Sequence, residues 1–382
     1  MKLKKQILFI GNDFGRTGAP LLLLEIAKFF KAQGWECFFF VEAGGILEPE
    51  YKKLGKIYLY TLNFNKYRKK LVRFPLKFLW NLCLRSLWRL QIAWRLKSLK
   101  ADVIYCNTGV SGYLLSSLQP VDSPVVMHIH EMAFILKHHC GLKFTQGIKF
   151  VDSFIAVCEE SKATLVRDYQ IPANKISLIP EFGMIEEWKP THRQEPSVFK
   201  VGCSGYPGWR KGTDLLLQVA QETKKRAGSF DIKFYCVGYN TDDSENISYN
   251  FDYQKAELSD ILEFVPPTRN PLPIYSQFQL QLLLSREDPN PLVVLEMGAL
   301  GIPVVCFKGS GRTNEIVKNG GGLEASYLSI SEIVDAIFEL KNNHKLREAC
   351  SLKIQSEVRT TFNKSKILLD IKKAVDGISK CA

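Results

Sequence analysis

Short apolar segments alternate with longer amphipathic segments along most of the chain. In the first half, continuous apolar runs bounded by turn residues predict strands over 6–11, 35–41, 102–106, 124–129 and 153–157, with a helix over 18–33 after the first strand. Such runs, separated by helices, are typical of a parallel sheet that is covered on both faces. Right-handed crossovers then predict a Rossmann-like domain.

A proline-containing polar stretch over 180–197 interrupts this pattern, and a second alternating series follows. Strands are predicted near 198–204, 231–237, 261–265, 280–285 and 303–307, with helices near 211–226 and 291–300 and a helical pattern beyond 329. The predicted fold is therefore α/β, with two Rossmann-like domains facing across a cleft and helices at the carboxyl end. The expected domains are 1–185 and 198–361, joined by a linker over 186–197, with a last helix over 362–382 that packs back on the first domain.

Composition narrows the class of protein. The chain has 382 residues, of which 46% are hydrophobic and 24% charged, so wholesale disorder is excluded. No uncharged apolar run is long enough for a membrane-spanning helix, and the first residues lead into a strand and leave no room for a signal peptide. The 10 cysteines include no Cys-x-x-Cys pair. We therefore expect a soluble, cytoplasmic protein with reduced thiols and without a zinc ribbon.

The net charge of +12 is concentrated in one region. Between Tyr51 and Ala101 there are 14 Lys or Arg residues and no Asp or Glu. Within it, apolar residues over 74–99 follow helical spacing and include Trp80 and Trp94. One interpretation is that the basic region 66–100 binds the anionic inner face of a membrane; the other is an amphipathic helix packed on its own domain. No nucleic-acid-binding motif accompanies the charge, so we expect no nucleic-acid partner.

Two loops have the composition of phosphate-binding loops. Gly15 and Gly18 lie between the first strand and the first helix, where backbone N–H groups can face an anion, although an ordinary strand-to-helix turn fits equally well. The second loop, over 205–214, places Arg210 and Lys211 among glycines before a helix. These two cations either bind phosphate together with the helix N–H groups or form a solvated surface pair.

The stretch over 285–304 contains two carboxylates, Asp288 before a predicted helix and Glu296 inside it. A separation of eight residues corresponds to a little over two helical turns, which predicts that both lie on one face. Carboxylates facing a cleft bind the hydroxyls of a sugar or a ribose. Alternatively, Asp288 caps the helix and Glu296 is an exposed helical residue.

This arrangement resembles the E-x7-E region of the GT4 glycosyltransferases, retaining enzymes of the GT-B fold that use nucleotide-sugar donors. Asp288 takes the place of the first glutamate and Glu296 that of the second. The resemblance extends over most of the chain, through the segments Thr17–Pro20, His128–Glu131, Arg210–Gly212 and Gly311–Val317.

The resemblance implies a role for each matching position. Lys211, assisted by Arg210, neutralises the donor diphosphate, while Glu296 binds the ribose hydroxyls. The donor sugar contacts Asp288 and the backbone at Asn290, Pro291 and Leu292. The N–H groups near Gly18 face the diphosphate, His130 lies beside the reacting sugar, and the loop after Val265 holds the base. The residues expected to take part in catalysis are therefore His130, Lys211 and Asp288.

The sequence departs from the family pattern at two positions. Many members carry an arginine six residues before the lysine, where this chain has Gly205, so Arg210 is the replacement expected to supply the charge. Asp288 is one methylene shorter than the usual glutamate.

Histidines in the first half raise the question of a metal site. The candidates are His128, His130 and Glu131, with His138 and His139 nearby. No cluster of cysteines or further carboxylates accompanies them, so no metal ligands are assigned. The resemblance likewise implies that no metal or other cofactor is needed. A purely structural role remains open for His128, whose side chain is expected to face away from that of His130.

The sequence thus predicts a metal-independent glycosyltransferase that moves a sugar, with retention of configuration, from a nucleotide-sugar donor to a glycan or lipid-linked acceptor, in surface polysaccharide or cell-envelope glycan synthesis. The acceptor is expected to bind mainly to domain 1–185 and the nucleotide sugar mainly to domain 198–361. The alternatives are a non-catalytic GT-B-like binding or scaffold protein and a nucleotide-sugar epimerase. The base, the sugar, the acceptor and the oligomeric state are not predicted.

Overall fold

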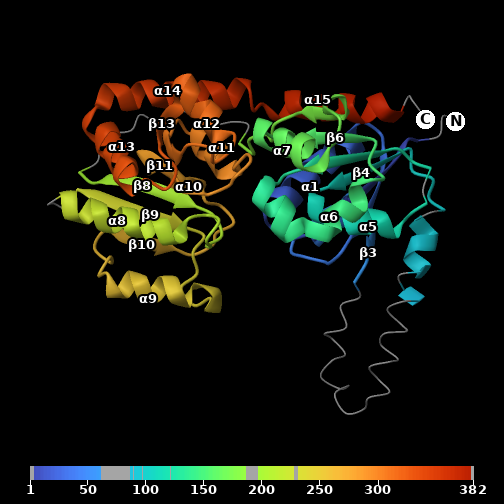
Figure 1. Ribbon diagram of the computed structural model, residues 1–382, viewed down its shortest axis with the longest axis horizontal. Coiled ribbons are helices and arrows are strands. Elements are labelled where there is room, and N and C mark those ends of the chain that lie inside the picture. Colours follow the sequence, from blue (N-terminus) through green and yellow to red (C-terminus); the bar gives the residue numbers. More distant parts are fainter. Residues whose placement is uncertain are drawn as a thin grey trace, which may run out of the picture. The chain divides into compact units, whose positions relative to one another are not determined.

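The computed structural model describes residues 4–61, 87–88, 90–96, 98–120, 122–185, 197–227 and 231–379. The chain divides into two compact units, called unit 1 and unit 2 below (Figure 1). Unit 1 comprises Met1–Pro180 with Ile367–Ala382, and unit 2 comprises Glu181–Lys366. Most of the linker predicted over 186–197 lies outside the described residues.

Unit 1 is built on a seven-stranded parallel sheet in the order β3-β2-β1-β4-β5-β6-β7. Its strands are β1 Gln6–Gly11, β2 Glu36–Val41, β3 Gly55–Leu59, β4 Val103–Asn107, β5 Val125–Ile129, β6 Ser153–Ala156 and β7 Ile176–Leu178. Its helices are α1 Gly18–Ala32, α2 Glu48–Leu54, α5 Gly112–Ser117, α6 Gly141–Ile148, α7 Glu159–Tyr169 and most of α15 Lys364–Ser379, with short helical turns η1 Gly109–Ser111, η2 Ile135–Cys140 and η3 Ala173–Lys175.

Unit 2 repeats this plan with a six-stranded parallel sheet in the order β10-β9-β8-β11-β12-β13. Its strands are β8 Phe199–Ser204, β9 Ile232–Val237, β10 Leu262–Val265, β11 Leu280–Leu283, β12 Val304–Phe307 and β13 Gly322–Ala325. Its helices are α8 Thr213–Ala227, α9 Ile247–Lys255, α10 Leu272–Tyr275, α11 Leu292–Ala299, α12 Thr313–Ile316, α13 Ile330–Asn342 and α14 His344–Thr360, with turns η4 Ser244–Asn246 and η5 Val317–Gly321.

Continuous burial of the central strands explains why the sequence pattern identified them. Every residue of β4 and β5 is buried, as are the last five residues of β1 and of β2. Three further strands, β3, β7 and β13, were not predicted. They lie at sheet edges and are short and partly exposed, so their apolar pattern is weak.

The strand order determines where a ligand is expected. In each sheet the order reverses beside the first strand, between β1 and β4 in unit 1 and between β8 and β11 in unit 2. Ligands of open parallel sheets bind outside the carboxyl ends of the strands at this switch point. The candidate residues fall at these two places.

Among the described residues, no helix has the length and apolar character required to cross a membrane.

Candidate active site

The loop after β8, over 205–212, approaches β11 closely at the switch point of unit 2. Gly205 has φ +144° and Gly212 has φ +74°, both unfavourable for residues with a side chain. A Cβ atom at Gly212 would lie 2.2 Å from the carbonyl oxygen of Leu284. Thr213 Oγ1 accepts a hydrogen bond from the N–H of Gly208 at 2.9 Å, where α8 begins. The glycines therefore let the loop carrying Arg210 and Lys211 pack against the segment that leads to Asp288.

Lys211 and Arg210 converge on one carboxylate. Lys211 Nζ lies 2.5 Å from Asp288 Oδ2, and Arg210 Nη1 lies 3.7 Å from Asp288 Oδ1. Arg210 Nη1 also donates to the carbonyl oxygen of Glu287 at 2.7 Å, and Ser285 Oγ lies 3.1 Å from Asp288 Oδ2. The two adjacent cations are thus directed to the same site. Arg210 provides there the positive charge that Gly205, which stands in the place of the family's arginine, cannot supply.

Asp288 is buried and ionised. Burial alone opposes its ionisation, but the charges of Lys211 and Arg210 and the hydrogen bonds from Lys211 and Ser285 outweigh burial and lower the pKa of Asp288 below its ordinary value. The local arrangement of two cations and one carboxylate carries a net positive charge. It suits the binding of an anion such as a diphosphate.

Arg286 connects the two loops, and the sequence analysis did not identify it. Its guanidinium forms two hydrogen bonds with the carboxylate of Asp214, at 2.8 and 3.0 Å, and its centre lies 4.6 Å from the ring centroid of Trp209. Arg286 Nη1 also donates to the carbonyl oxygen of Trp209, and its own N–H donates to that of Arg210 at 2.8 Å. Because these partners are some 70 residues away in sequence, no local pattern reveals the connection.

The segment from Asp288 to Leu292 leads into α11. Asn290 and Pro291 are buried, and α11 begins at Leu292 with Pro291 as its N-cap residue. Pro291 has no N–H, so only Asn290 and Leu292 of the three expected donor-binding residues have a backbone donor. The prediction that Asp288 and Glu296 share a helical face by a separation of two turns is wrong, because the residues before Leu292 are not helical.

Glu296 lies about one turn inside α11 and is half-buried. Its negative charge acts on Tyr275: burial raises the pKa of Tyr275 most, the hydrogen bond with Ser204 lowers it, and the charge of Glu296 raises it further. The hydroxyl of Tyr275 forms a 2.6 Å hydrogen bond with Ser204 Oγ, at the last residue of β8. Glu296 and Lys211 therefore both lie near the carboxyl end of β8.

Val265 is the last residue of β10, and its backbone forms hydrogen bonds with the segment after β9. Its carbonyl oxygen accepts hydrogen bonds from the N–H groups of Gly238 and Tyr239, at 2.9 and 3.1 Å. The backbone of Val265 thus fixes the end of β9, at the same edge of the sheet as the end of β8.

In unit 1, His130 follows β5 and contacts the end of β4. Its Nε2 donates to Asn107 Oδ1 at 2.9 Å, and its ring centroid lies 4.0 Å from that of His128. The prediction that the two histidines face opposite sides is wrong, because residues two apart on an extended segment lie on the same side. Burial, and then the neighbouring His130, lower the pKa of His128 well below its ordinary value, so His128 is neutral. The hydroxyl of Tyr105 and His128 Nδ1 form a hydrogen bond of 2.6 Å.

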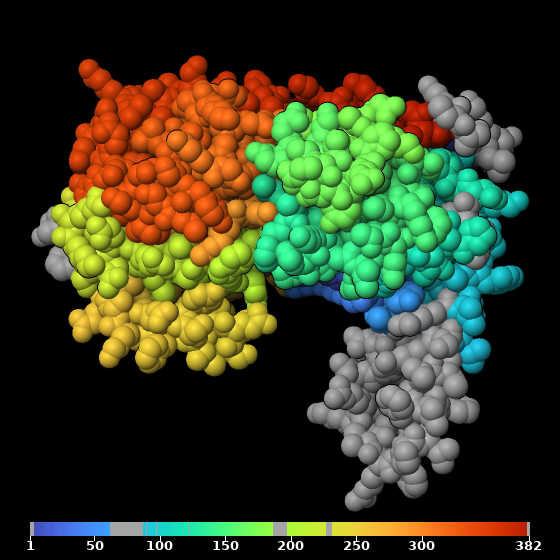
Figure 2. All heavy atoms as spheres, viewed as in Figure 1, coloured from blue at the N-terminus to red at the C-terminus, as the bar shows by residue number. Residues whose placement is uncertain are grey.

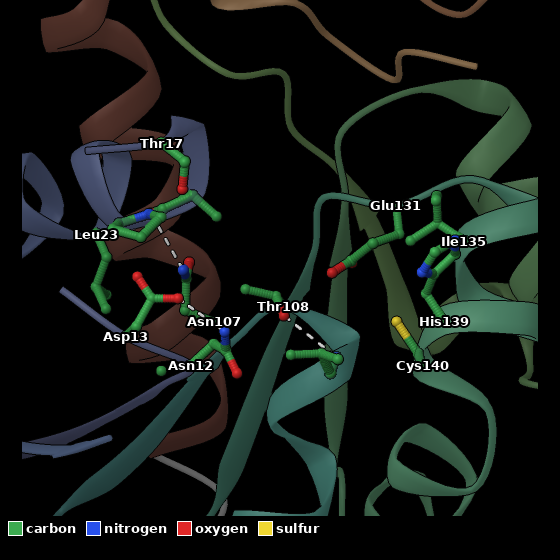
Figure 3. Close-up of a pocket in the computed structure, with 14 residues that line it drawn as sticks. Asn12, Asp13, Thr17, Leu23, Asn107, Thr108, Glu131, Ile135, His139 and Cys140 are labelled. Carbon is green, nitrogen blue, oxygen red and sulfur yellow. Dashed lines mark hydrogen bonds between the residues drawn. The ribbon is translucent and has the colours of Figure 1, made fainter. Parts of the chain in front are cut away.

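Gly18 is the first residue of α1 and is exposed. The loop before it borders a cavity that also touches the ends of β1 and β4 (Figure 3). The described residues contain no group of three or more His, Cys, Asp or Glu side chains arranged to hold a metal ion.

Comparisons with known proteins agree with this architecture. The model of Glycosyltransferase Family 4 matches residues 16–182, and that of Glycosyl transferases group 1 matches residues 195–343. A Haemophilus influenzae protein described as an uncharacterized glycosyltransferase is 25% identical over 356 residues, which cover 90% of this chain and 92% of that protein.

Solved structures share the fold. HepE of Anabaena, in complex with UDP and glucose, has 16% identity and a TM-score of 0.77, with 97% of this chain and 99% of HepE covered. Sucrose-phosphate synthase of Thermosynechococcus elongatus has 17% identity and a TM-score of 0.78, with 99% and 100% covered. Residues 16–182 therefore belong to Glycosyltransferase Family 4 and residues 195–343 to Glycosyl transferases group 1, and the chain has the GT-B fold.

Proposed function

We propose that the protein transfers a sugar from a nucleoside-diphosphate sugar to a glycan or lipid-linked acceptor, with retention of configuration at the anomeric carbon. The observation that supports this best is the convergence of Lys211 and Arg210 on buried Asp288 at the switch point of unit 2. A diphosphate that enters this site finds two cations held in place by the fold. Its departure from the sugar develops negative charge that these cations stabilise.

The other proposed contacts with the donor are assigned residue by residue. Glu296 accepts hydrogen bonds from the ribose hydroxyls, and Asp288, with the N–H groups of Asn290 and Leu292, contacts the donor sugar. The backbone after Val265 holds the base, His130 lies beside the reacting sugar, and the N–H groups near Gly18 face the diphosphate. We propose a uridine diphosphate donor, since HepE was solved with UDP and with UDP-glucose.

The same cationic cluster supports metal-independent transfer. Two cations in a partly buried site provide the counter-charge that a divalent ion supplies in other enzymes. We expect transfer to continue in the presence of a chelator.

A panel of UDP-sugars tests the function. Wild-type protein is incubated with each donor, with and without oligosaccharide and lipid-linked acceptors, and products are followed by NMR, which also reports the anomeric configuration. We expect acceptor-dependent transfer that keeps the anomeric configuration of the donor. Transfer should be lost in Lys211→Ala and unchanged in the control Lys225→Ala, which changes an exposed lysine of α8. Binding of UDP without transfer or hydrolysis across the panel would support a scaffold protein instead, and sugar isomerisation without an acceptor would support an epimerase.

We further propose that unit 1 associates with an anionic membrane, as suits a role in surface polysaccharide or envelope glycan synthesis. Residues 87–88 and 90–96 are helical, and this segment, cyan in Figure 2, lies on the surface. It buries Ile92 and Leu96 in the core but exposes Leu87, Leu90 and Trp94, at spacings of three and four residues. An outward apolar face within a region that has only basic charges suits the headgroup layer of an anionic bilayer. The predicted helical residues before 87 lie outside the described residues.

Flotation with vesicles tests this association. We expect binding to vesicles with anionic lipid, and loss of binding in Leu90→Ser/Trp94→Ser. Leu142→Ser, which changes an exposed leucine of α6, is the matched control. Negligible binding to both anionic and neutral vesicles would reject the proposal.

A further inference from the structure

Asn107 connects two segments of unit 1 that the proposed function brings to the donor. It is the last residue of β4, and only 1% of its surface is exposed. Its Nδ2 lies 3.2 Å from the carbonyl oxygen of Ala19, in the first turn of α1 next to Gly18 (Figure 3). Its Oδ1 lies 2.9 Å from Nε2 of His130, the residue after β5. One buried amide therefore bonds to the start of α1 and to the histidine proposed to lie beside the reacting sugar.

The contact with Ala19 determines which way the amide of Asn107 faces. A carbonyl oxygen only accepts hydrogen bonds, so the amide atom opposite the oxygen of Ala19 is the donor Nδ2. A reversed amide would place two acceptor oxygens against each other in a buried position, which loses the hydrogen bond and leaves both groups desolvated. Oδ1 therefore faces His130.

The orientation of this amide determines which nitrogen of His130 carries a proton. Oδ1 of Asn107 only accepts, so Nε2 of His130 must donate to it. A neutral imidazole has a single N–H group, and the partner of one ring nitrogen decides which nitrogen bears it. Neutral His130 is thus the Nε2–H tautomer, with its lone pair at Nδ1.

The ring of His130 is also held on one of its faces. The ring centroid of His128 lies 4.0 Å away, with an angle of 38° between the two ring planes. His128 is itself fixed by the 2.6 Å hydrogen bond between its Nδ1 and the hydroxyl of Tyr105. The contact of Asn107 with the ring edge and the contact of His128 with the ring face together restrict rotation of the His130 ring.

The backbone after Asn107 is held in a strained conformation. Thr108 has φ +78°, which β-branched residues rarely adopt. Its N–H donates to the carbonyl oxygen of His128 at 2.8 Å, and the carbonyl oxygen of Asn107 accepts from Ser111 Oγ at 2.9 Å. Such strain persists where the surrounding structure enforces it, and it is concentrated at functional sites. The fold therefore fixes the position of Asn107 at the expense of a strained neighbour.

Glu131 enforces this conformation from the segment after β5. Both of its carboxyl oxygens accept from the N–H of Gly109 at 3.2 Å, and Oε2 also accepts from the N–H of His130 at 2.9 Å. The turn is closely packed, since a Cβ atom at Gly109 would lie 2.9 Å from Leu136 Cδ2. One buried carboxyl group thus binds the backbone on both sides of the contact between Asn107 and His130.

We propose that Asn107 is a positioning residue for sugar transfer, which holds His130 in the Nε2–H tautomer and in one ring orientation. Glu131 assists by fixing the turn that follows Asn107. The proposal rests on the proposed function, in which His130 lies beside the reacting sugar. Asn107 acts through His130 and not on the substrate.

NMR of the full-length protein, with isotope-labelled histidine ring nitrogens, tests the tautomer without any substrate. In mildly alkaline buffer we expect a protonated Nε2 and an unprotonated Nδ1 for His130, with the assignment taken from the signals lost in His130→Gln. In Asn107→Leu an apolar group replaces the acceptor, so the Nε2 proton should exchange with water at least about tenfold faster, equivalent to about 1.4 kcal/mol. Asn107→Asp keeps an acceptor at this position and should retain the slow exchange.

Steady-state kinetics, with the donor and acceptor identified by the panel of UDP-sugars, tests the effect on transfer. We expect kcat of Asn107→Leu to fall at least about tenfold, because a displacement of about 1 Å near the reacting atoms costs up to roughly 10²-fold. KM for the donor should change less than about threefold, since the proposed diphosphate contacts of Lys211 and Arg210 remain. Asn107→Asp should recover part of kcat. The control Thr164→Val removes a buried hydroxyl of α7 that donates to the carbonyl oxygen of Glu160 at 2.8 Å, and it should leave kcat unchanged.

A double variant shows whether Asn107 acts through His130. His130→Ala removes the ring that Asn107 positions, so Asn107→Leu/His130→Ala should be no more than about twofold slower than His130→Ala alone. A merely structural role of Asn107 would instead lower kcat by the same factor with and without the ring. If Asn107→Leu does not fold, Asn107→Ser repeats the test, because serine keeps a small polar side chain that is too short for either contact.

Three results would overturn the proposal. They are a neutral His130 that is protonated at Nδ1, proton exchange and kcat in Asn107→Leu equal to those of the wild type, and equal effects of Asn107→Leu with and without the His130 ring. Any of these in an enzyme that transfers sugar would reject the role of Asn107 alone. If the wild type transfers no sugar from any donor, the proposed function fails, and the role of Asn107 in transfer fails with it.

Discussion

Replacing Lys211 with methionine tests the central ion pair most directly. The substitution keeps the length of the side chain and leaves Asp288 with Ser285 Oγ at 3.1 Å and Arg210 Nη1 at 3.7 Å. Removal of one partner from a fully buried pair costs about 3–5 kcal/mol. Here 25% of the Lys211 side chain is exposed, so solvent screens the pair, and Arg210 remains. We therefore expect the free energy of unfolding of unit 2 to fall by about 1–2 kcal/mol.

The double variant Lys211→Met/Asp288→Asn distinguishes the pair from other effects. It removes both charges, so part of the lost stability should return, with a coupling energy of about 1 kcal/mol in the double-mutant cycle. UDP binding should remain weak in the double variant, because the cation is still missing. Urea unfolding and calorimetry measure the two effects, and Lys225→Met controls for loss of an exposed lysine from α8.

The pH dependence adds a third check. The pKa of Asp288 is lowered in the folded protein, so its contribution to stability is present above its unfolded pKa of about 3.9 and is lost as the pH falls through the folded value. The difference in stability between wild type and Asp288→Asn should therefore be constant near neutral pH and shrink below about pH 4. A coupling energy near zero, together with a difference that does not change with pH, would refute the ion-pair reasoning.

Three further substitutions test separate parts of the structure. The pKa of His128 is lowered by burial, so below pH about 6.5 the unfolded chain binds a proton that the folded chain does not. As the pH is lowered, the stability of the wild type relative to His128→Gln should then fall by up to about 1.4 kcal/mol per pH unit. Urea unfolding between pH 7.5 and 5.5 measures this difference, and a difference that does not change with pH would contradict the prediction. Gly205→Arg restores the arginine common in the family but places a side chain at φ +144°. We therefore expect the free energy of unfolding to fall by about 1–2 kcal/mol and UDP to bind no more tightly, and a gain in affinity would show the reasoning wrong. Arg286→Lys should lower the free energy of unfolding by about 1–2 kcal/mol and weaken UDP binding several-fold, because lysine retains neither the two hydrogen bonds to Asp214 nor the stacking on Trp209. Unchanged UDP binding would limit Arg286 to a minor role.

The sequence pattern predicted the central part of both sheets because those strands are buried on both faces. Residues 7–10 are a continuous apolar run for that reason and became the centre of β1, whereas the run in β8 is interrupted by the partly exposed Lys200. The edge strand β3 carries a mixed sequence, because one side of it has no neighbouring strand. Its position follows from pairing with β2, which depends on tertiary contact.

The candidate site, like the fold, was predicted only in part from the sequence. Residue type and order along the chain identified Arg210, Lys211 and Asp288 and, through the resemblance to GT4 enzymes, the family. The direction of their side chains was not predicted. Lys211 and Asp288 are 77 residues apart, and their contact arises because β8 and β11 are neighbours in the sheet.

The sequence by itself therefore determined the fold class and the residues capable of binding a nucleotide sugar, since local periodicity and residue chemistry are written along the chain. The tertiary structure alone decided that Lys211 and Arg210 share one buried carboxylate, that Arg286 joins their two loops, and that a cavity adjoins Asn107. Each of these depends on distances between segments remote in sequence, and these distances are fixed by the order and register of the strands.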